Sequence, residues 1–385
     1  MVDLIPAHCT EYELDSSSAG DIIVAEAPGR IYFMGEHCIG GGGVSLVSGI
    51  DRFVRIAASP RKDSALRFFS AGSGERKRTT TANLRYKRED RWANHVKIAL
   101  CLFSELGNTI PGFSFTIATD IPRHSGLAYN IAVEVAAAVA LRSYFKSNIS
   151  DRDLITKLAE LHLEFYEHEN KIVDFLAIMF AKKDTFLAIN PGTHTVKKIK
   201  SPFSQFQILL LDSKVPWFGI EEDLRERQNV LKRAIATLSE RKGGLAISAY
   251  PTEELTALIA SFDEVIRRCC MHIASEIVRV QETERALKEN DEAVLAKIFF
   301  ASHESLRDLY EISCPELDWL VKRAQEIPGV MAARMTGKGF GGCTYAIMRP
   351  EHIAEYNARM DDYERIFGFR PIIYEIRQAN GARIV

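Results

Sequence analysis

The pattern of apolar and polar positions changes along the chain and predicts a mixed fold of strands and helices. Short apolar runs in the first half, such as residues 22–26 and 113–119, have the length and the flanking turn residues of strands. Residues 131–145 are mostly Ala, Val and Leu, which is typical of a buried helix, and residues 151–167 have helical spacing of apolar positions. The second half predicts amphipathic helices and then strands, at about 221–242, 252–268, 274–289 and 291–303, and near 330 and 343.

Turn residues between these halves predict a domain boundary. The chain has 385 residues, 46% of them hydrophobic, which exceeds the usual size of a single core, so two domains are expected. Asn190-Pro191-Gly192 and Ser201-Pro202 interrupt the periodicity. We therefore expect one domain at residues 1–200 and a second at 201–385, with residues 1–20 as a loose polar arm.

Charge and cysteine content argue against several classes of function. The 49 Lys and Arg residues nearly balance the 51 Asp and Glu residues, so we expect no nucleic-acid partner, which would need a dense basic surface. The basic cluster Arg76-Lys77-Arg78 is interpreted as a solvated hairpin or loop. The cysteines lack C-x-x-C spacing, which argues against a disulfide framework or a cysteine zinc site. Without a membrane helix or a secretory segment, we expect no membrane partner and a cytoplasmic location.

Three segments carry candidate chemistry. Residues 27–43 place Arg, Glu and His beside a run of glycines, a combination that can grip a polyol or simply form a surface turn. Residues 121–127 form a glycine loop that opens the apolar helix, and the free N–H groups at a helix start suit nucleotide phosphates. Residues 334–344 form another glycine-rich loop, which packs against a ligand or acts as a structural turn.

The order and spacing of these segments resemble the galactokinase branch of the GHMP small-molecule kinases. The family's first motif reads P-G-R-V-N-L-I-G-E-H-T-D-Y-N-G-G, and Pro28 to Gly43 follows it. Its second reads G-L-S-S-S-A-A-L-E-V-A, with Gly126-Leu127 and Glu134-Val135-Ala136 in register, and its third, M-T-G-A-G-F-G-G-C, is matched from Met335 to Cys343. Residues 92–97 resemble the family's W-A-N-Y-V-K.

This resemblance implies a fold, an activity and a set of site residues. The implied fold is α+β, with an N-terminal GHMP kinase domain like ribosomal protein S5 domain 2 and a ferredoxin-like C-terminal domain. Asp174 matches the family's catalytic base and Arg30 the arginine that steadies the transferred phosphoryl group, and such a reaction needs positioning and charge neutralisation. Glu36 and His37 match residues of the sugar-binding loop. The positions expected to bind ATP are Ser125, Gly126, Leu127, Ala128, Asn130, Gly339 and Gly341.

Departures from the family pattern affect the expected substrate. Ile39 stands where the family has the Asp of E-H-T-D, and Leu224 aligns with its sugar-contacting Tyr. A pocket that hydrogen-bonds a hydroxyl discriminates strongly, and aliphatic side chains remove that discrimination. We therefore expect a sugar or polyol other than galactose to be the best substrate.

The expected metal ligands also depart from the family. The family holds Mg²⁺ with the last Ser of G-L-S-S-S and a Glu twelve residues before the base, and these positions are Asn130 and His162 here. Mg²⁺ prefers oxygen ligands, and a two-residue slip in the alignment would offer Glu164 in place of His162.

Two functions therefore stay open. The first is an ATP- and Mg²⁺-dependent kinase that phosphorylates the anomeric hydroxyl of a sugar, or a hydroxyl of a related polyol. The second is a catalytically inactive homologue that senses a ligand or binds a partner. Retention of Asp174 and Arg30 favours the first, and the altered metal pair favours the second.

Overall fold

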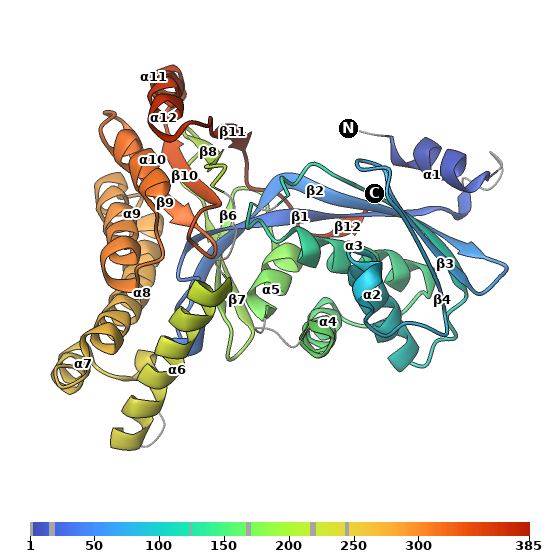
Figure 1. Ribbon diagram of the computed structural model, residues 1–385, viewed down its shortest axis with the longest axis horizontal. Helices are drawn as coiled ribbons and strands as arrows, with labels where there is room; N and C mark the ends of the chain where they lie inside the picture. Colours follow the sequence, from blue (N-terminus) through green and yellow to red (C-terminus); the bar gives the residue numbers. More distant parts are fainter. Residues whose placement is uncertain (1–2, 15–19, 124, 167–170, 216–220, 243–245) are drawn as a thin grey trace.

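Two β-sheets, with helices packed against each, form the framework of the protein. The computed structural model describes residues 3–14, 20–123, 125–166, 171–215, 221–242 and 246–385 (Figure 1). The larger sheet contains β1 (Ile23–Met34), β2 (Ser45–Arg61), β3 (Ala65–Ser70), β4 (Arg76–Thr80), β5 (Gly112–Thr119), β6 (Thr185–Asn190), β7 (Thr195–Lys200) and β12 (Arg383–Ile384). The smaller sheet contains β8 (Gln207–Asp212), β9 (Val330–Thr336), β10 (Cys343–Met348) and β11 (Ile372–Ile376).

The strand order links the end of the chain to its beginning. The main path of the larger sheet is β12-β1-β2-β5-β3-β4, with β6 paired to β2 and β7 to β6, and the smaller sheet has the order β11-β8-β10-β9. Only β3 and β5 pair in parallel among the described strand pairs. Residue 200 ends β7, and β12 returns to the larger sheet beside β1. The proposed units 1–200 and 201–385 thus share one sheet.

Four of the described helices lie on one face of the larger sheet. Figure 1 shows α2 (Ala93–Glu105), α3 (Tyr129–Tyr144), α4 (Asp151–Tyr166) and α5 (Ile172–Phe180) on this face. Residues 131–141 of α3 are all buried, because this helix packs against β1 and β2 on one side and α2, α4 and α5 on the other. This position explains the uniformly apolar sequence that predicted a buried helix.

The opposite face of the larger sheet carries α1 (Leu4–Tyr12), where the sequence predicted a loose arm. That prediction is wrong, because polar residues of the helix find partners on the sheet. The buried ring of His8 hydrogen-bonds the hydroxyls of Thr116 and Ser59, each at 2.8 Å, and the Tyr12 hydroxyl donates to the carbonyl of Phe115 at 2.7 Å. Burial lowers the pKa of His8 to about 4.

The second half of the chain is mainly helical, as predicted, with one break displaced. Its helices are α6 (Glu221–Lys242), α7 (Thr252–Ile259), α8 (Glu264–Glu289), α9 (Glu292–Ser305), α10 (Pro315–Gln325), α11 (Ile353–Ala358) and α12 (Met360–Phe367). The predicted break at 269–273 does not exist, because α8 continues through these residues. The break lies before residue 264, where the Asp263 side chain accepts a hydrogen bond from the Ile266 amide and caps α8. No described helix is both long and apolar enough to cross a membrane.

Candidate active site

A buried ion pair connects the first strand to the helix that carries the predicted base. Arg30 lies on β1 and Asp174 in the first turn of α5, and Arg30 Nε donates to Asp174 Oδ1 at 2.6 Å. Tyr32, two residues along β1 and on the same face, donates its hydroxyl to the same oxygen at 2.8 Å. The Arg30 guanidinium also lies over the Tyr32 ring, 4.3 Å from its centroid.

Burial and mutual contacts determine the protonation states of Arg30, Tyr32 and Asp174. Burial alone would raise the pKa of Asp174, but the charge and hydrogen bond of Arg30, assisted by Lys171 and Tyr32, hold it below its ordinary value. Burial and the neighbouring Asp174 raise the pKa of the Tyr32 hydroxyl well above its ordinary value, so that it stays a donor. The site therefore contains an ionised carboxylate at neutral pH.

Arg30 also holds the predicted phosphate loop. Its Nη1 donates to the carbonyl of Gly126 at 2.6 Å, and its backbone amide donates to the carbonyl of Leu127 at 3.1 Å. A Cβ at Gly29 would lie 3.2 Å from that same Leu127 oxygen, so glycine permits the close approach of strand and loop. This contact explains why β1 continues through Pro28-Gly29, where the sequence predicted a strand end, with only a shift in register.

The phosphate loop ends at the start of α3. Ser125 is buried and donates its hydroxyl to the carbonyl of Pro122 at 2.6 Å, which closes the loop. Gly126 and Ala128 both have positive φ, at 76° and 61°, and the Ala128 cap places no side chain on the amides of the first turn. Asn130 lies exposed in that turn. The N-terminal amides of α3 are thus arranged as an anion site requires.

The third glycine loop meets the other two segments. A Cβ at Gly337 would lie 3.7 Å from the carbonyl oxygen of Gly126, and the Gly337 carbonyl accepts a hydrogen bond from His37 Nε2 at 3.1 Å. Gly339, with φ of 88°, packs so closely on the Ile312 carbonyl that a Cβ would lie 2.4 Å from that oxygen. Gly341 also has a positive φ, of 128°. All three motifs therefore converge on one region.

Glu36 has a partner that the sequence did not predict. Both of its carboxylate oxygens accept hydrogen bonds from the fully buried Arg334, each at 2.8 Å. Arg334 also contacts Glu276 at 3.1 Å and Ser302 at 2.7 Å. Burial would raise the pKa of Glu276, but the charge of Arg334 contributes to lowering it to about 2. Glu36 is thus fixed rigidly, with only its remaining lone pairs available to a ligand.

The two aliphatic departures lie on elements that pack together. Ile39 opens a short helical turn, Ile39–Gly41, and Leu224 lies near the start of α6. Leu231 of α6 covers this turn, since a Cβ at Gly40 would lie 3.0 Å from the Leu231 side chain. Ile39 and Leu224 are both partly buried.

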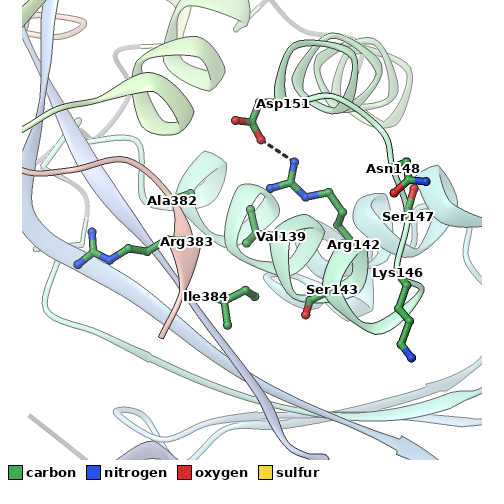
Figure 2. A pocket seen from close by; sticks show the side chains of 10 residues that line it. All are labelled: Val139, Arg142, Ser143, Lys146, Ser147, Asn148, Asp151, Ala382, Arg383 and Ile384. Atoms are coloured by element: carbon green, nitrogen blue, oxygen red, sulfur yellow. Dashed lines mark hydrogen bonds and ion pairs between the residues drawn. The ribbon is translucent and has the colours of Figure 1, made fainter.

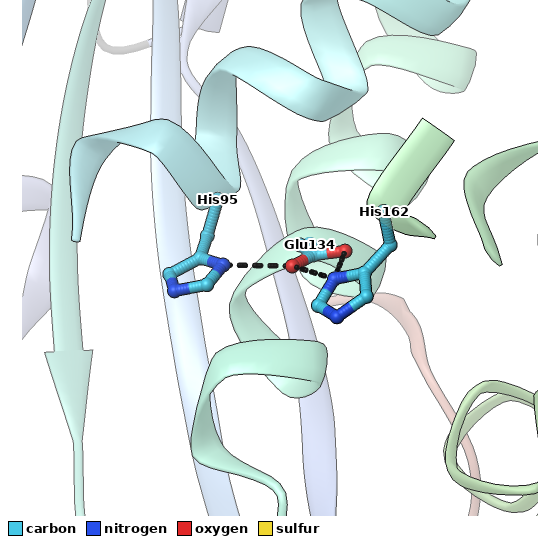
Figure 3. Close-up of side chains that lie close together, drawn as sticks. All are labelled: His95, Glu134 and His162. Atoms are coloured by element: carbon cyan, nitrogen blue, oxygen red, sulfur yellow. Dashed lines mark hydrogen bonds and ion pairs between the residues drawn. The ribbon is translucent and has the colours of Figure 1, made fainter. Parts of the chain in front are cut away.

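The expected metal positions have different surroundings from one another. His162 is buried on α4, with Nδ1 at 2.9 and 3.1 Å from the carboxylate oxygens of Glu134 (Figure 3). Asn130, by contrast, is exposed on α3. Glu164 is exposed on α4. An imidazole held by a carboxylate does not fit the oxygen preference of Mg²⁺.

Three site residues were missed from the sequence. Tyr32 stands where the family motif has Asn, and alternation along a strand would have placed it beside Arg30 had β1 not been predicted to stop early. Thr336 accepts a hydrogen bond from the Tyr32 amide at 3.1 Å and donates to its carbonyl at 2.9 Å, which joins the two sheets. Arg334 precedes the third motif and carried no separate signal.

A hollow of about 550 Å³ lies away from these motifs, between the end of α3, the start of α4 and β12 (Figure 2). Arg142 and Asp151 form an ion pair at 2.5 Å across its rim. None of the residues that line it belongs to the three motif segments. It therefore adds nothing to the candidate active site.

Comparisons with known proteins agree with this geometry. Residues 94–182 match the model of the GHMP kinases N terminal domain, residues 283–360 that of the GHMP kinases C terminal domain, and residues 11–60 the galactokinase galactose-binding signature. A putative galactokinase of Treponema pallidum is 36% identical over 369 residues, which cover 94% of this chain and 92% of that protein. The galactokinase of Bacillus subtilis is 29% identical over 365 residues, 93% of each chain.

Solved structures show the same fold. The structure of Lactococcus lactis galactokinase complexed with galactose superposes with a TM-score of 0.91 at 24% identity, covering 98% of both chains. The mevalonate kinase of Methanococcus jannaschii gives a TM-score of 0.67 at 17% identity, covering 94% of this chain and 99% of that one.

Proposed function

Because this chain belongs to the galactokinase family of the GHMP kinases, we propose that it is an ATP-dependent kinase for the anomeric hydroxyl of a sugar, or a hydroxyl of a related polyol. The family and the α+β GHMP kinase fold expected from the sequence are confirmed. The observation that carries the proposed activity is the buried carboxylate of Asp174, held by Arg30 and Tyr32 beside the phosphate loop.

Asp174 is the proposed base. The hydrogen bonds from Arg30 and Tyr32 both reach Oδ1, so we expect Oδ2 to accept the proton of the reacting hydroxyl. A carboxylate with a lowered pKa is a weak base, and the proton is therefore expected to move late, as the bond to phosphorus forms. Tyr32 keeps the carboxylate oriented while the acceptor binds.

Arg30 is the proposed charge stabiliser. One guanidinium nitrogen contacts the base and another contacts the Gly126 carbonyl, so its charge lies between the acceptor side and the phosphate loop. ATP, when bound, supplies the transferred phosphoryl group. The amides at residues 125–130 and the glycine loop at 337–341 are expected to hold its phosphates. Since the imidazole of His162 does not fit the oxygen preference of Mg²⁺, the roles proposed for Asp174 and Arg30 involve no Mg²⁺ step.

The acceptor is proposed to differ from galactose. Ile39 and Leu224 place aliphatic groups at positions where the family has side chains that contact the sugar hydroxyls. Glu36 and His37 supply the remaining polar contacts of the sugar-binding loop. Both are held by residues of the C-terminal half, Glu36 by Arg334 and His37 by the Gly337 carbonyl. A sugar or cyclitol with fewer hydroxyls at these points fits the site better.

The second candidate function is a ligand sensor without catalytic activity. It is favoured by one observation, the buried His162–Glu134 contact at the position expected for a Mg²⁺ ligand. A sensor would bind sugar or nucleotide through the same loops but release no ADP.

ADP release separates the two candidates. Purified protein is incubated with ATP, a divalent cation and a panel of sugars and cyclitols. For the accepted compound, Asp174→Asn is expected to lower kcat by about 10²–10⁴-fold, because general base catalysis contributes that much. The matched control is Asp184→Asn, the same change at an exposed aspartate.

Undiminished turnover in Asp174→Asn would remove this residue from the role of base. No ADP release with any acceptor, together with a thermal shift caused by sugar or ATP, would favour the sensor.

A further inference from the structure

Three ionisable side chains from three helices meet in the interior behind the phosphate loop. His95 of α2, Glu134 of α3 and His162 of α4 point toward one another, and all three are buried (Figure 3). Their nearest ligand atoms all lie within 4.8 Å of one another. This cluster is separate from the Arg30–Asp174 pair and has no role in the proposed reaction.

The contacts within the cluster centre on one carboxylate. His95 Nδ1 lies 2.7 Å from Glu134 Oε1, and His162 Nδ1 lies 2.9 Å from the same oxygen. The ring of Tyr166 packs against both imidazoles, with centroids 5.1 and 5.0 Å away, and Phe175 packs against His162 at 5.7 Å. The Tyr166 hydroxyl also lies 3.1 Å from His95 Nδ1, so this residue contributes a polar contact as well as an aromatic one.

Glu134 is a fully buried carboxylate whose described partners are two imidazoles. Its side chain has no exposed surface, and its ion-pair partners among the described residues are the two histidines, with no Lys or Arg. A buried charge is costly unless it is paired with an opposite charge or coordinates a metal. A cation in the cluster would supply that charge.

The two histidines are both departures from the family motifs. His95 stands where W-A-N-Y-V-K has Tyr, and His162 stands where the family has Glu, whereas Glu134 matches the motif residue. These two positions are far apart in the sequence, yet both imidazoles contact the same carboxylate. Incidental surface changes would not be expected to converge in this way.

We propose that His95, Glu134 and His162 bind a divalent transition-metal ion of the zinc and iron(II) class. Two imidazoles and one carboxylate are a donor set that suits such ions and not Mg²⁺ or Ca²⁺. In tetrahedral coordination, donor atoms at about 2.0–2.2 Å from one ion are about 3.3–3.6 Å apart. The present Nδ1–Oε1 separations of 2.7 and 2.9 Å would open by about 0.4–0.9 Å when the ion binds.

The cluster lies close to the phosphate loop and to α5, so a bound ion would affect the structure of both. Glu134 lies four residues after Asn130, on the same face of α3, so the ion would sit about 6 Å along the helix from the phosphate loop. His162 packs against Phe175, the neighbour of Asp174 in α5. An ion here would fasten α2, α3 and α4 together directly behind the elements that position the phosphate loop and the base.

Binding of Co²⁺ to the full-length protein tests this proposal, with Co²⁺ as the spectroscopic probe. After treatment with a chelator, the wild type is expected to bind one equivalent of Co²⁺ and to develop d–d absorption bands. The variants His95→Phe, His162→Leu and Glu134→Gln each remove one of the proposed ligands and are each expected to weaken Co²⁺ binding by at least about tenfold. The matched control His194→Asn, in the turn between β6 and β7, is expected to bind like the wild type.

A measurement on the wild type alone guards against variants that fail to fold. Proton NMR of the Co²⁺-loaded wild type is expected to show two hyperfine-shifted exchangeable imidazole N–H resonances, one from each histidine. Absence of these resonances, or binding that is equally strong in the folded cluster variants and in the control, would overturn the proposal. The cluster would then be a hydrogen-bonded trio without an ion.

Discussion

At the scale of single residues, the hydroxyl of Tyr32 is the least expected part of the site. It gives Asp174 a second donor on the oxygen that already binds Arg30. Tyr32→Phe removes this donor and leaves the buried carboxylate with less compensation, so the free energy of unfolding should fall by about 1–3 kcal/mol. Urea unfolding at pH 7 measures the change.

Tyr86→Phe provides the control, because it removes the same hydroxyl from an exposed ring. Equal stability of Tyr32→Phe and the wild type would mean that the hydroxyl does not support the carboxylate.

The sugar-binding loop, which carries Ile39, gives a second prediction at the scale of single residues. The double change Ile39→Asp and Leu224→Tyr restores the polar residues of the family. Galactose should then bind at least about tenfold more tightly, because side chains that hydrogen-bond the sugar hydroxyls discriminate strongly between sugars. Isothermal titration with galactose checks this. No gain in affinity would indicate that the pocket differs from the family at more than these two side chains.

At the scale of elements, α1 connects local sequence to the pH dependence of stability. Burial lowers the pKa of His8 to about 4, whereas an unfolded histidine titrates near 6.5. The unfolded chain therefore binds more protons between these values, and stability is lost as the pH falls from 6.5 toward 4, by up to about 1.4 kcal/mol per pH unit. His272, whose pKa burial lowers to about 3, acts in the same direction.

His8→Gln removes the titrating group of α1 and is expected to flatten this slope, although it also lowers stability at pH 7. Denaturant unfolding at pH 7 and pH 5 compares the variant with the wild type. An unchanged slope would show that His8 already titrates normally in the folded protein.

Comparison of the predicted and observed helices shows which parts of the fold could be predicted from the sequence. The helices at 131–145, 151–167 and 221–242 were close to their observed bounds, because apolar periodicity reports directly on burial. The arm at α1 was misjudged, since the partners of His8 lie on strands more than fifty residues away and leave no local pattern. Likewise, Arg334 and Glu36 find each other only in the folded chain.

At the scale of the whole molecule, the C-terminal tail joins the two sheets. Gly381 precedes β12, and a Cβ there would lie 2.1 Å from the Met179 carbonyl oxygen. Gly381→Ala must therefore displace the tail from α5, and we expect the free energy of unfolding to fall by about 1–3 kcal/mol. Thermal or denaturant unfolding measures this loss.

The control is Gly72→Ala, at a position where an added Cβ meets nothing within 4 Å. If both changes had equal effects, the tail would not contribute to the stability of the larger sheet.

The position of β12 also bears on how the protein is made. A ribosome delivers β1 early, but residues 383–384 only after the smaller sheet and its helices have been synthesised. Until then Ala25 and Glu26 on the outer edge of β1 lack the strand that pairs with them in the finished protein. An unpaired edge is a template for association with other chains. We therefore expect the nascent chain to depend on chaperones through most of its translation.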